Sequence, residues 1–385
     1  MKHRTQILFS IFLLFGIIVN GNASKTPADT YRLLHLFNEV FRHIRQESAV
    51  LISDRELIEG AISGMMRTVD SYSYYIPEER YKNMVVNFKG ELEGIGLELV
   101  QEGEKTKVIT PFEYSPAWRA GIKPGDQILS INGKKTDGLS LLEIGDLMQG
   151  TISEPIVLEI KREGSLETVR FTLKREKIVM KNIRWEMKGP VAYLRLSNFN
   201  YQHTSSHLKK ALEAILKQNP KGLVLDLRNN PGGLLDEALK CTNFFIENSV
   251  IVQVQPREKE KTYRYETAKE ALVPSLPMIV LVNEGTASCA EIMAGALQDH
   301  QRALIMGSSS FGKGKVQSIL PLSPGYAAIQ LTTAHYLTPK GRNIQSVGIQ
   351  PDVLLKHSMG NQDIVKEEAI NLLKARGETP KKGIS

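Results

Sequence analysis

The pattern of apolar and polar positions changes twice along this chain. Between residues 28 and 88, apolar residues recur every three or four positions, as on one face of a helix. From Phe88 the apolar runs become short and are bounded by Gly, Pro and Asp, which is typical of strands. From about Ile178, apolar runs alternate with amphipathic segments. This last pattern predicts a layered α/β domain.

The middle, strand-rich region is interrupted by one predicted helix. The helix begins at Ser140, and Glu143 three residues later completes a capping-box pattern. In the last region, "GLVLDLR" and "PMIVLVN" are continuous apolar runs, as expected for strands buried on both faces. We therefore predict an α/β multidomain fold with five segments: a signal peptide, a helical region, a mostly β domain, an α/β core, and a C-terminal helix with its tail, at residues 1–23, 24–87, 88–176, 177–356 and 357–385.

The N-terminal residues predict export. The basic "MKHRTQ" is followed by the apolar run "ILFSIFLLFGIIV" and by small residues around Ala23. This layout is typical of a secretory signal peptide, and the run is too short for a comfortable membrane span. We expect cleavage after Ala23 and no stable membrane span afterwards. An uncleaved membrane anchor is the alternative.

Composition narrows the choice of partners. The formal charge of the 385-residue chain is +7, spread along its length. No basic block has interleaved aromatic residues, so we expect no nucleic-acid partner. The stretch "GSSSFGKG" matches a phosphate-binding P-loop up to Lys313 but has Gly314 where a hydroxyl should coordinate magnesium. We expect no cofactor and no metal.

Two turns carry candidate chemistry. "KGLVLDLRNNPGG" ends a buried strand in a turn whose backbone N–H groups could bind an oxyanion. The alternative is a tight connection in which the glycines only allow positive φ. "PMIVLVNEGTASCAEIMAGAL" places Ser288 between a strand and a helix, where a nucleophile gains an exposed hydroxyl and the N–H of Cys289. The alternative for Ser288 is a helix N-cap.

A catalytic serine needs a base, which a capping serine does not. A Ser-x-x-Lys arrangement would place a lysine at position 291, but this residue is Glu291. The histidines His300 and His335 lie outside any Gly-rich setting. Lys313 stands between two glycines in "SSSFGKGKVQ", and Gln317 follows four residues later. Lys313 is therefore the candidate base, acting as a free amine.

Together and in this order, "RNNPGG", "EGTASCAEIMAGAL", "FGKGKVQ" and "TPKGRNIQSVGIQPDV" resemble the carboxyl-terminal processing, or tail-specific, proteases. The resemblance extends from about Thr30 to the C-terminal helix. It implies a crotonase-like or Clp-like α/β core with a Ser–Lys site. By position, Ser288 would be the nucleophile, Lys313 the base and Gln317 the group that positions it. The N–H groups of Cys289 and Gly232 would form the oxyanion hole, with Gly233 as the alternative to Gly232.

The resemblance also covers the mostly β region. "GELEGIGLEL" and "SPAWRAGIKPGDQILSINGKK" resemble a PDZ domain, which captures a chain terminus by adding it to a sheet edge. The carboxylate would bind the loop of Gly94, Ile95, Gly96 and Leu97.

The family resemblance implies an exported, ATP-independent serine endopeptidase that acts on proteins with apolar C-termini, in the periplasm or outside the cell. Two alternatives remain from the sequence: a catalytically silent PDZ adaptor, and a crotonase-like acyl-transfer enzyme. The N-terminal helices are candidates for a contact between two copies of the chain.

Overall fold

A computed structural model gives the structure of the chain. It describes residues 28–86, 91–165, 167–179, 182–199, 203–268, 270–323, 327–355 and 363–378. The predicted signal peptide and the residues after 378 lie outside this part. The chain forms two compact units that meet in sequence between Ala61 and Ile62. Among the described helices, none combines the length and the apolar character that a membrane crossing requires.

The first unit contains the predicted N-terminal helices. They are α1 (Ala28–Glu47) and the first half of α2 (Asp54–Val69). Leu33, Leu34 and Phe37 on α1 are 57%, 59% and 46% exposed, so its apolar side is open in the single chain. Ser53 begins α2 with a capping box, because its hydroxyl accepts the Glu56 N–H and the Glu56 carboxylate accepts the Ser53 N–H.

The second unit contains a strand that the helical pattern of residues 28–88 did not indicate. The segment after α2 forms β1 (Tyr74–Pro77) before α3 (Glu78–Val86). Strand β1 pairs antiparallel with β18, with Tyr74 opposite Gln330. The remaining strands of this sheet come from the C-terminal half of the chain: β13 (Val250–Pro256), β14 (Tyr263–Glu266), β17 (Lys315–Ser323) and β18 (Ala327–Leu337).

The predicted PDZ region forms an antiparallel sheet with its own core. A two-stranded ribbon of β2 (Glu91–Gly94) and β9 (Glu176–Val179) joins the residues where the chain enters and leaves it. Buried isoleucines and leucines from the sheet pack against α4 (Pro116–Arg119) and α5 (Leu141–Met148). The strands of the sheet are β3 (Leu97–Glu102), β4 (Lys105–Pro111), β5 (Gln127–Ile131), β6 (Lys134–Lys135), β7 (Pro155–Lys161) and β8 (Thr168–Lys174).

Strand β3 has two differently occupied faces. A bulge next to β3 adds its extra residue to β4, so side chains still alternate along β3. Leu97 and Leu99 pack against the PDZ core beside α5. Val100 points the other way and joins a buried cluster with Tyr72 and Ala287, which lie outside the PDZ sheet. One strand therefore contacts both the PDZ core and the α/β core.

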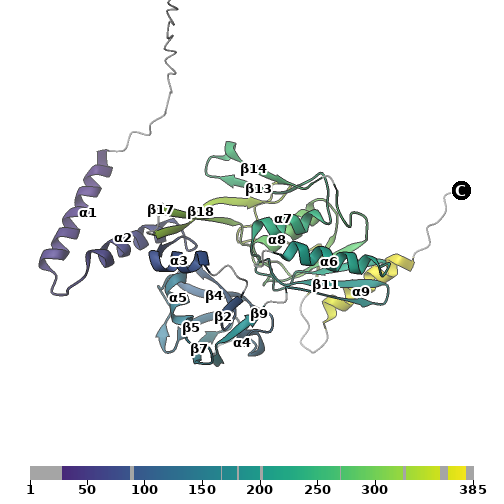
Figure 1. The fold of residues 1–385 in the computed structure, drawn as a ribbon, viewed down its shortest axis with the longest axis horizontal. Helices are drawn as coiled ribbons and strands as arrows, with labels where there is room; N and C mark the ends of the chain where they lie inside the picture. The colour runs from purple at the N-terminus through teal and green to yellow at the C-terminus, as the bar shows by residue number, and fades with distance from the viewer. Residues whose placement is uncertain are drawn as a thin grey trace, which may run out of the picture. The chain divides into compact units, whose positions relative to one another are not determined.

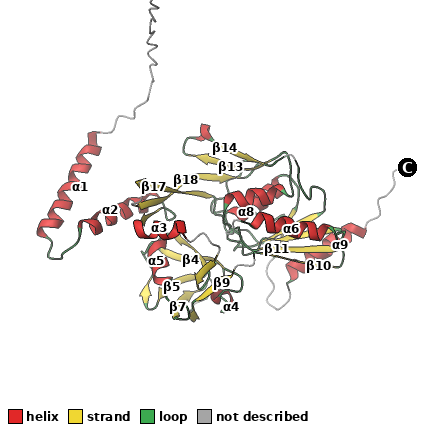
Figure 2. Ribbon diagram, in the orientation of Figure 1, coloured by secondary structure: helices red, strands yellow, loops and turns green. Residues whose placement is uncertain are grey.

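The α/β core is a six-stranded sheet between two layers of helices. Its order is β10-β11-β12-β15-β16-β19, and only the β10–β11 pair is antiparallel. Helices α6 (Thr204–Leu216), α7 (Leu235–Asn243) and α8 (Cys289–Asp299) lie side by side on one face, and α9 (Ile364–Glu378) packs on the other (Figure 1). Figure 2 shows how these helices and strands alternate through the core. The strands are β10 (Ile183–Lys188), β11 (Val191–Leu196), β12 (Gly222–Asp226), β15 (Met278–Val282), β16 (Leu304–Gly307) and β19 (Val353–Leu354); a short 3-10 turn, η1, spans Lys259–Lys261.

The structure confirms the predicted fold class: a mixed α/β protein with an inserted PDZ domain and N-terminal helices. Buried strands formed where apolar runs were continuous, and helices formed where apolar residues recurred at helical spacing.

Candidate functional site

Ser288 lies on a strained turn between β15 and α8. Its backbone has φ 55° and ψ −121°, a region that L residues seldom occupy. Ordinary N-cap residues are extended, as Ser115 is at the start of α4, with φ −69° and ψ 164°. The turn is held by Asn283 and Thr286: the Thr286 hydroxyl donates to the Leu227 carbonyl and accepts the Asn283 N–H. Ser288 therefore has the backbone of a nucleophile turn and not of a simple cap.

Glu291 ties this turn to the loop that carries Lys313. The side chain is fully buried, and its carboxylate accepts the backbone N–H groups of Ser288, Gly312 and Lys313 at 2.8, 2.7 and 2.8 Å. The Ser310 hydroxyl donates a fourth bond at 2.5 Å. Burial raises the pKa of the Glu291 carboxyl, and these hydrogen bonds offset only part of that effect. Sequence reasoning treated Glu291 only as the residue that occupies the place of a lysine.

One cavity of about 220 Å³ brings the predicted residues together. Ser288, Cys289, Lys313 and Gln317 all line it. The turn after β15 and the first residue of α8 supply Ser288 and Cys289, the loop before β17 supplies Lys313, and β17 itself supplies Gln317. Within the described residues, no three histidine, cysteine or acidic side chains gather as a metal site would require.

The lysine side of the cavity contains residues from the N-terminal part of the second unit. The ammonium of Lys313 lies 5.8 Å from the centre of the Tyr72 ring, and that of Lys315 lies 5.1 Å from it. Both distances allow a cation–π attraction. Lys315 is also paired with Asp70 at 2.8 Å. The pairing keeps Lys315 beside the ring.

The candidate nucleophile and the candidate base are not hydrogen-bonded to each other in this structure. In the described part of the chain, no hydrogen bond joins the Ser288 hydroxyl to the Lys313 amine, and Gln317 donates instead to the Thr332 hydroxyl at 3.3 Å. Catalytic hydrogen bonds are often long before substrate binds. The three side chains line one cavity without hydrogen bonds among them.

The glycines after β12 lie against the Ser288 turn. A Cβ on Gly232, which has φ 97°, would come within 2.8 Å of the Cys289 nitrogen. The Gly232 N–H already donates to the Asn230 side chain at 2.9 Å. Gly233 lines the cavity, and its N–H has no partner among the described residues. These contacts favour Gly233 over Gly232 as an oxyanion donor, whereas Gly232 keeps the space beside Cys289 free.

The predicted carboxylate-binding loop precedes β3. The carbonyl oxygens of Ile95 and Gly96 accept the N–H groups of Ala117 and Phe112. Within the described residues, the N–H groups of Ile95 and Gly96 donate to nothing. Gly96 has φ 77°, and a Cβ there would lie 2.3 Å from the Ser115 Cβ. The loop is therefore fixed through its carbonyls, with donors left over for an anion.

Glu98 is a cavity residue that sequence reasoning missed. It lies on β3, directly after the carboxylate-binding loop, and lines the same cavity as Ser288 and Lys313. Burial raises the pKa of the Glu98 carboxyl, opposed by the positive charge of Lys313. No local pattern marks this residue, because its place depends on how the PDZ sheet packs against the core.

Comparisons with known proteins identify the family of the chain. Residues 190–355 match the model of Peptidase family S41, and residues 113–162 match that of a PDZ domain. A carboxy-terminal-processing protease of Bartonella bacilliformis is 39% identical over 355 residues, which cover 91% of this chain and 81% of that protein. The carboxy-terminal processing protease CtpA of Bacillus subtilis is 33% identical over 366 residues, covering 92% and 78%.

A solved structure shows the same fold. The photosystem II D1 C-terminal processing protease superposes with a TM-score of 0.74 at 27% sequence identity. The alignment covers 88% of this chain and 96% of that one.

Proposed function

Because this chain belongs to the carboxy-terminal-processing proteases of peptidase family S41, and is a serine endopeptidase acting on protein C-termini, we propose that Ser288 and Lys313 are its catalytic dyad. The observation that carries the proposal is the single cavity lined by Ser288, Lys313 and Gln317, with the N–H groups of Cys289 and Gly233 beside them. A nucleophile, a base and oxyanion donors at one place are the parts that acyl transfer needs.

The proposed chemistry follows Ser–Lys logic. The Ser288 oxygen attacks the scissile carbonyl carbon while its proton passes to the free amine of Lys313. The N–H groups of Gly233 and Cys289 bind the oxyanion, which is typically worth about 3 kcal/mol per donor. When the C–N bond breaks, the Lys313 ammonium protonates the leaving amine. Water then attacks the acyl-enzyme ester while Lys313 takes its proton, and the Lys313 ammonium returns this proton to the Ser288 oxygen as the ester C–O bond breaks and the new carboxyl product leaves.

Gln317 is proposed as a positioning residue. Its amide lies in the cavity and is held by Thr332. A change of side-chain rotamer would let the amide oxygen accept from the Lys313 amine and orient its lone pair toward Ser288.

The proposed substrate is a protein whose C-terminus is apolar. The free N–H groups of Ile95 and Gly96 suit a terminal carboxylate, and Leu97 beside α5 supplies apolar surface for the last side chain. Amidating that terminus removes the charge that these donors bind, so cleavage of the amidated protein should be slower.

Export and self-association complete the proposal. Residues 1–23 have the composition of a signal peptide, and we infer that the mature protease works in the bacterial periplasm.

The exposed apolar residues of α1 favour contact with a second copy. Light scattering of the mature chain with Leu34→Glu and Phe37→Glu tests that contact; an unchanged mass would contradict it.

Labelling with an active-site serine probe tests the dyad. The intact chain should be labelled, whereas Ser288→Ala should not be, and Lys313→Ala should react far more slowly. Equal labelling of the intact chain and Lys313→Ala would remove Lys313 from the mechanism. No labelling of the intact chain, folded and at alkaline pH, would favour the silent adaptor.

A further inference from the structure

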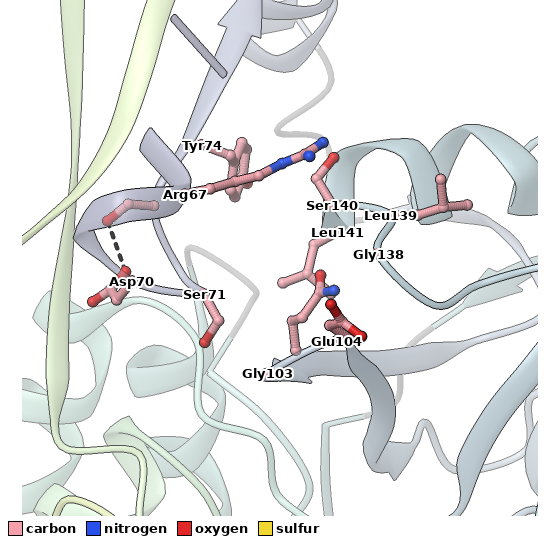
Figure 3. A pocket seen from close by; sticks show the side chains of 12 residues that line it. Arg67, Asp70, Ser71, Tyr74, Gly103, Glu104, Gly138, Leu139, Ser140 and Leu141 are labelled. Carbon is pink, nitrogen blue, oxygen red and sulfur yellow. Dashed lines mark hydrogen bonds between the residues drawn. The ribbon is translucent and has the colours of Figure 1, made fainter. Parts of the chain in front are cut away.

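A second cavity, of about 360 Å³, lies outside the catalytic pocket (Figure 3). Three segments far apart in sequence line it: the end of α2 with the following loop and β1, the hairpin between β3 and β4, and the start of α5. In Figure 3, Arg67 reaches across toward Ser140 while Glu104 borders the hairpin side. The polar groups that matter below are Arg67, Asp70, Ser71, Gln101 and Glu104.

The position of this cavity relates it to the peptide-binding groove. The groove runs between β3 and α5, and the loop at residues 94–97 lies at the beginning of β3. Gln101 and Ser140 mark the opposite end, where α5 begins. A peptide added antiparallel to β3 rises about 3.4 Å per residue. With its carboxylate at the loop, it would place the side chain about four residues before the terminus at this cavity.

The cavity has unused hydrogen-bonding groups. Gln101 is only 8% exposed, lines the cavity, and its carboxamide makes no hydrogen bond in the described part of the chain. The amide faces the open cavity, so both its oxygen and its NH₂ group are available to a side chain that enters there. Leu97, Leu99 and Gln101 share one face of β3, so the amide belongs to the groove side of the strand.

Among the charged side chains that line this cavity, one acidic residue lacks an ion-pair partner in the described part of the chain. Asp70 is paired with Lys315 at 2.8 Å, and Arg67 lies 3.4 Å from the Glu143 carboxylate. Glu104 forms no ion pair with any described residue. A basic side chain entering the cavity would meet the Glu104 carboxylate and the carbonyl oxygen of Gln101. An acidic side chain would meet Glu104 with like charge.

We propose that this cavity is a subsite for a lysine or arginine side chain about four residues before the C-terminus of the substrate. The proposal rests on the proposed binding of substrate tails along β3. The protease would then recognise a second substrate residue besides the apolar terminal one. One wall of this subsite comes from the α2–β1 segment, outside the PDZ domain.

The test uses one folded substrate protein with an apolar terminal residue. Lysine, alanine or glutamate is placed in turn at each position from the third to the sixth before the end. At one position, kcat/KM should be about fivefold higher for lysine than for glutamate, since exposed charge pairs change affinity by roughly that factor. Glu104→Lys should reverse this preference, and Gln101→Leu should weaken it mainly through KM.

Glu163→Lys is the matched control, because it reverses a charge on the exposed turn between β7 and β8 of the same domain. This variant should keep the lysine preference and hydrolyse a short peptide at the unmodified rate. No charge preference at any position, or a preference that Glu104→Lys leaves unchanged, would overturn the subsite. An amidated tail separates the two ideas: if amidation slows cleavage but lysine has no effect, only the subsite fails.

Discussion

Ser140 and Ser288 each precede a helix, and each is followed three residues later by a glutamate. At Ser140 the pattern gives an ordinary capping box: the backbone is extended, with φ −69° and ψ 159°, and the Glu143 side chain is 46% exposed. At Ser288 the backbone has positive φ, and Glu291 is fully buried between two loops. The same Ser-x-x-Glu pattern therefore caps a helix in one domain and, in the other, ties the Ser288 turn to the loop of Lys313.

The difference lies in what surrounds the glutamate. Glu143 bonds only to the start of its own helix and to Arg67. Glu291 bonds to Ser288 and also to a loop more than 18 residues further along the chain, at Ser310, Gly312 and Lys313. A local motif acquires a distant role when burial forces its carboxylate to find all its donors inside the protein.

The largest contrast is expected from removing the two hydroxyls. Ser288→Ala should lower peptide hydrolysis about a thousandfold or more, because the nucleophile is lost. Ser140→Ala should leave hydrolysis of a short peptide unchanged and cost only about 1 kcal/mol of unfolding free energy. Steady-state kinetics and urea unfolding measure both. Near-normal turnover by Ser288→Ala would show that the Ser288 hydroxyl is not the nucleophile.

A smaller contrast is expected from the two glutamates. Glu291→Gln places an amide NH₂ group among N–H donors, so it should cost about 1–3 kcal/mol of stability and, by displacing Lys313, lower kcat about tenfold to a hundredfold. Glu143→Gln should change stability by less than about 1 kcal/mol and leave kcat unchanged. A Glu291→Gln protein with lower stability but normal kcat would show that the clamp does not position the lysine.

The smallest contrast concerns pH, and its sign differs between the two sites. Burial raises the pKa of Glu291 above its usual value of 4.5, so its carboxyl stabilises the fold below that value and loses this contribution as pH rises through the raised pKa. For Glu143, burial opposes the charge, but the bonds with Ser140 and the charge of Arg67 outweigh it and lower the pKa. Its contribution is present above 4.5 and is lost as pH falls.

Urea unfolding across acidic and neutral pH checks these signs. The stability advantage of the unmodified protein over Glu291→Gln should grow on acidification, whereas its advantage over Glu143→Gln should shrink. Parallel pH curves for both variants would mean that the two carboxylates have similar environments after all.

The sequence was sufficient for those parts of the molecule in which neighbouring residues decide the structure. The apolar pattern predicted the buried strands β12 and β15 and the helix after Ser288, which is α8, and the turn pattern singled out Ser288. It did not predict β1, since four residues pair with a strand about 250 positions later. Lys313 was selected as the candidate base because it lies between two glycines, and the family resemblance gave it the same role and gave Gln317 its positioning role. Spacing alone does not bring either residue to Ser288.

The missed site residues share one cause. Asp70, Tyr72 and Glu98 reach the lysine side of the cavity only after the PDZ sheet and the β1 segment have packed against the core. The choice between Gly232 and Gly233 also needed coordinates, because it turns on which N–H the Asn230 side chain already occupies.

The alternation of β3 limits how this protease can be re-engineered or can diverge. Leu97, Leu99 and Gln101 lie on the side of β3 that faces the PDZ core and the second cavity, while Glu98 and Val100, between them, face the cavity of Ser288 and the core cluster. A PDZ domain taken from another protein would bring a suitable groove but the wrong intervening residues. When substrate tails bind along β3 as proposed, the PDZ domain cannot be exchanged without also changing the residues that face the core. New tail preferences are then most easily reached by changing every second residue of β3.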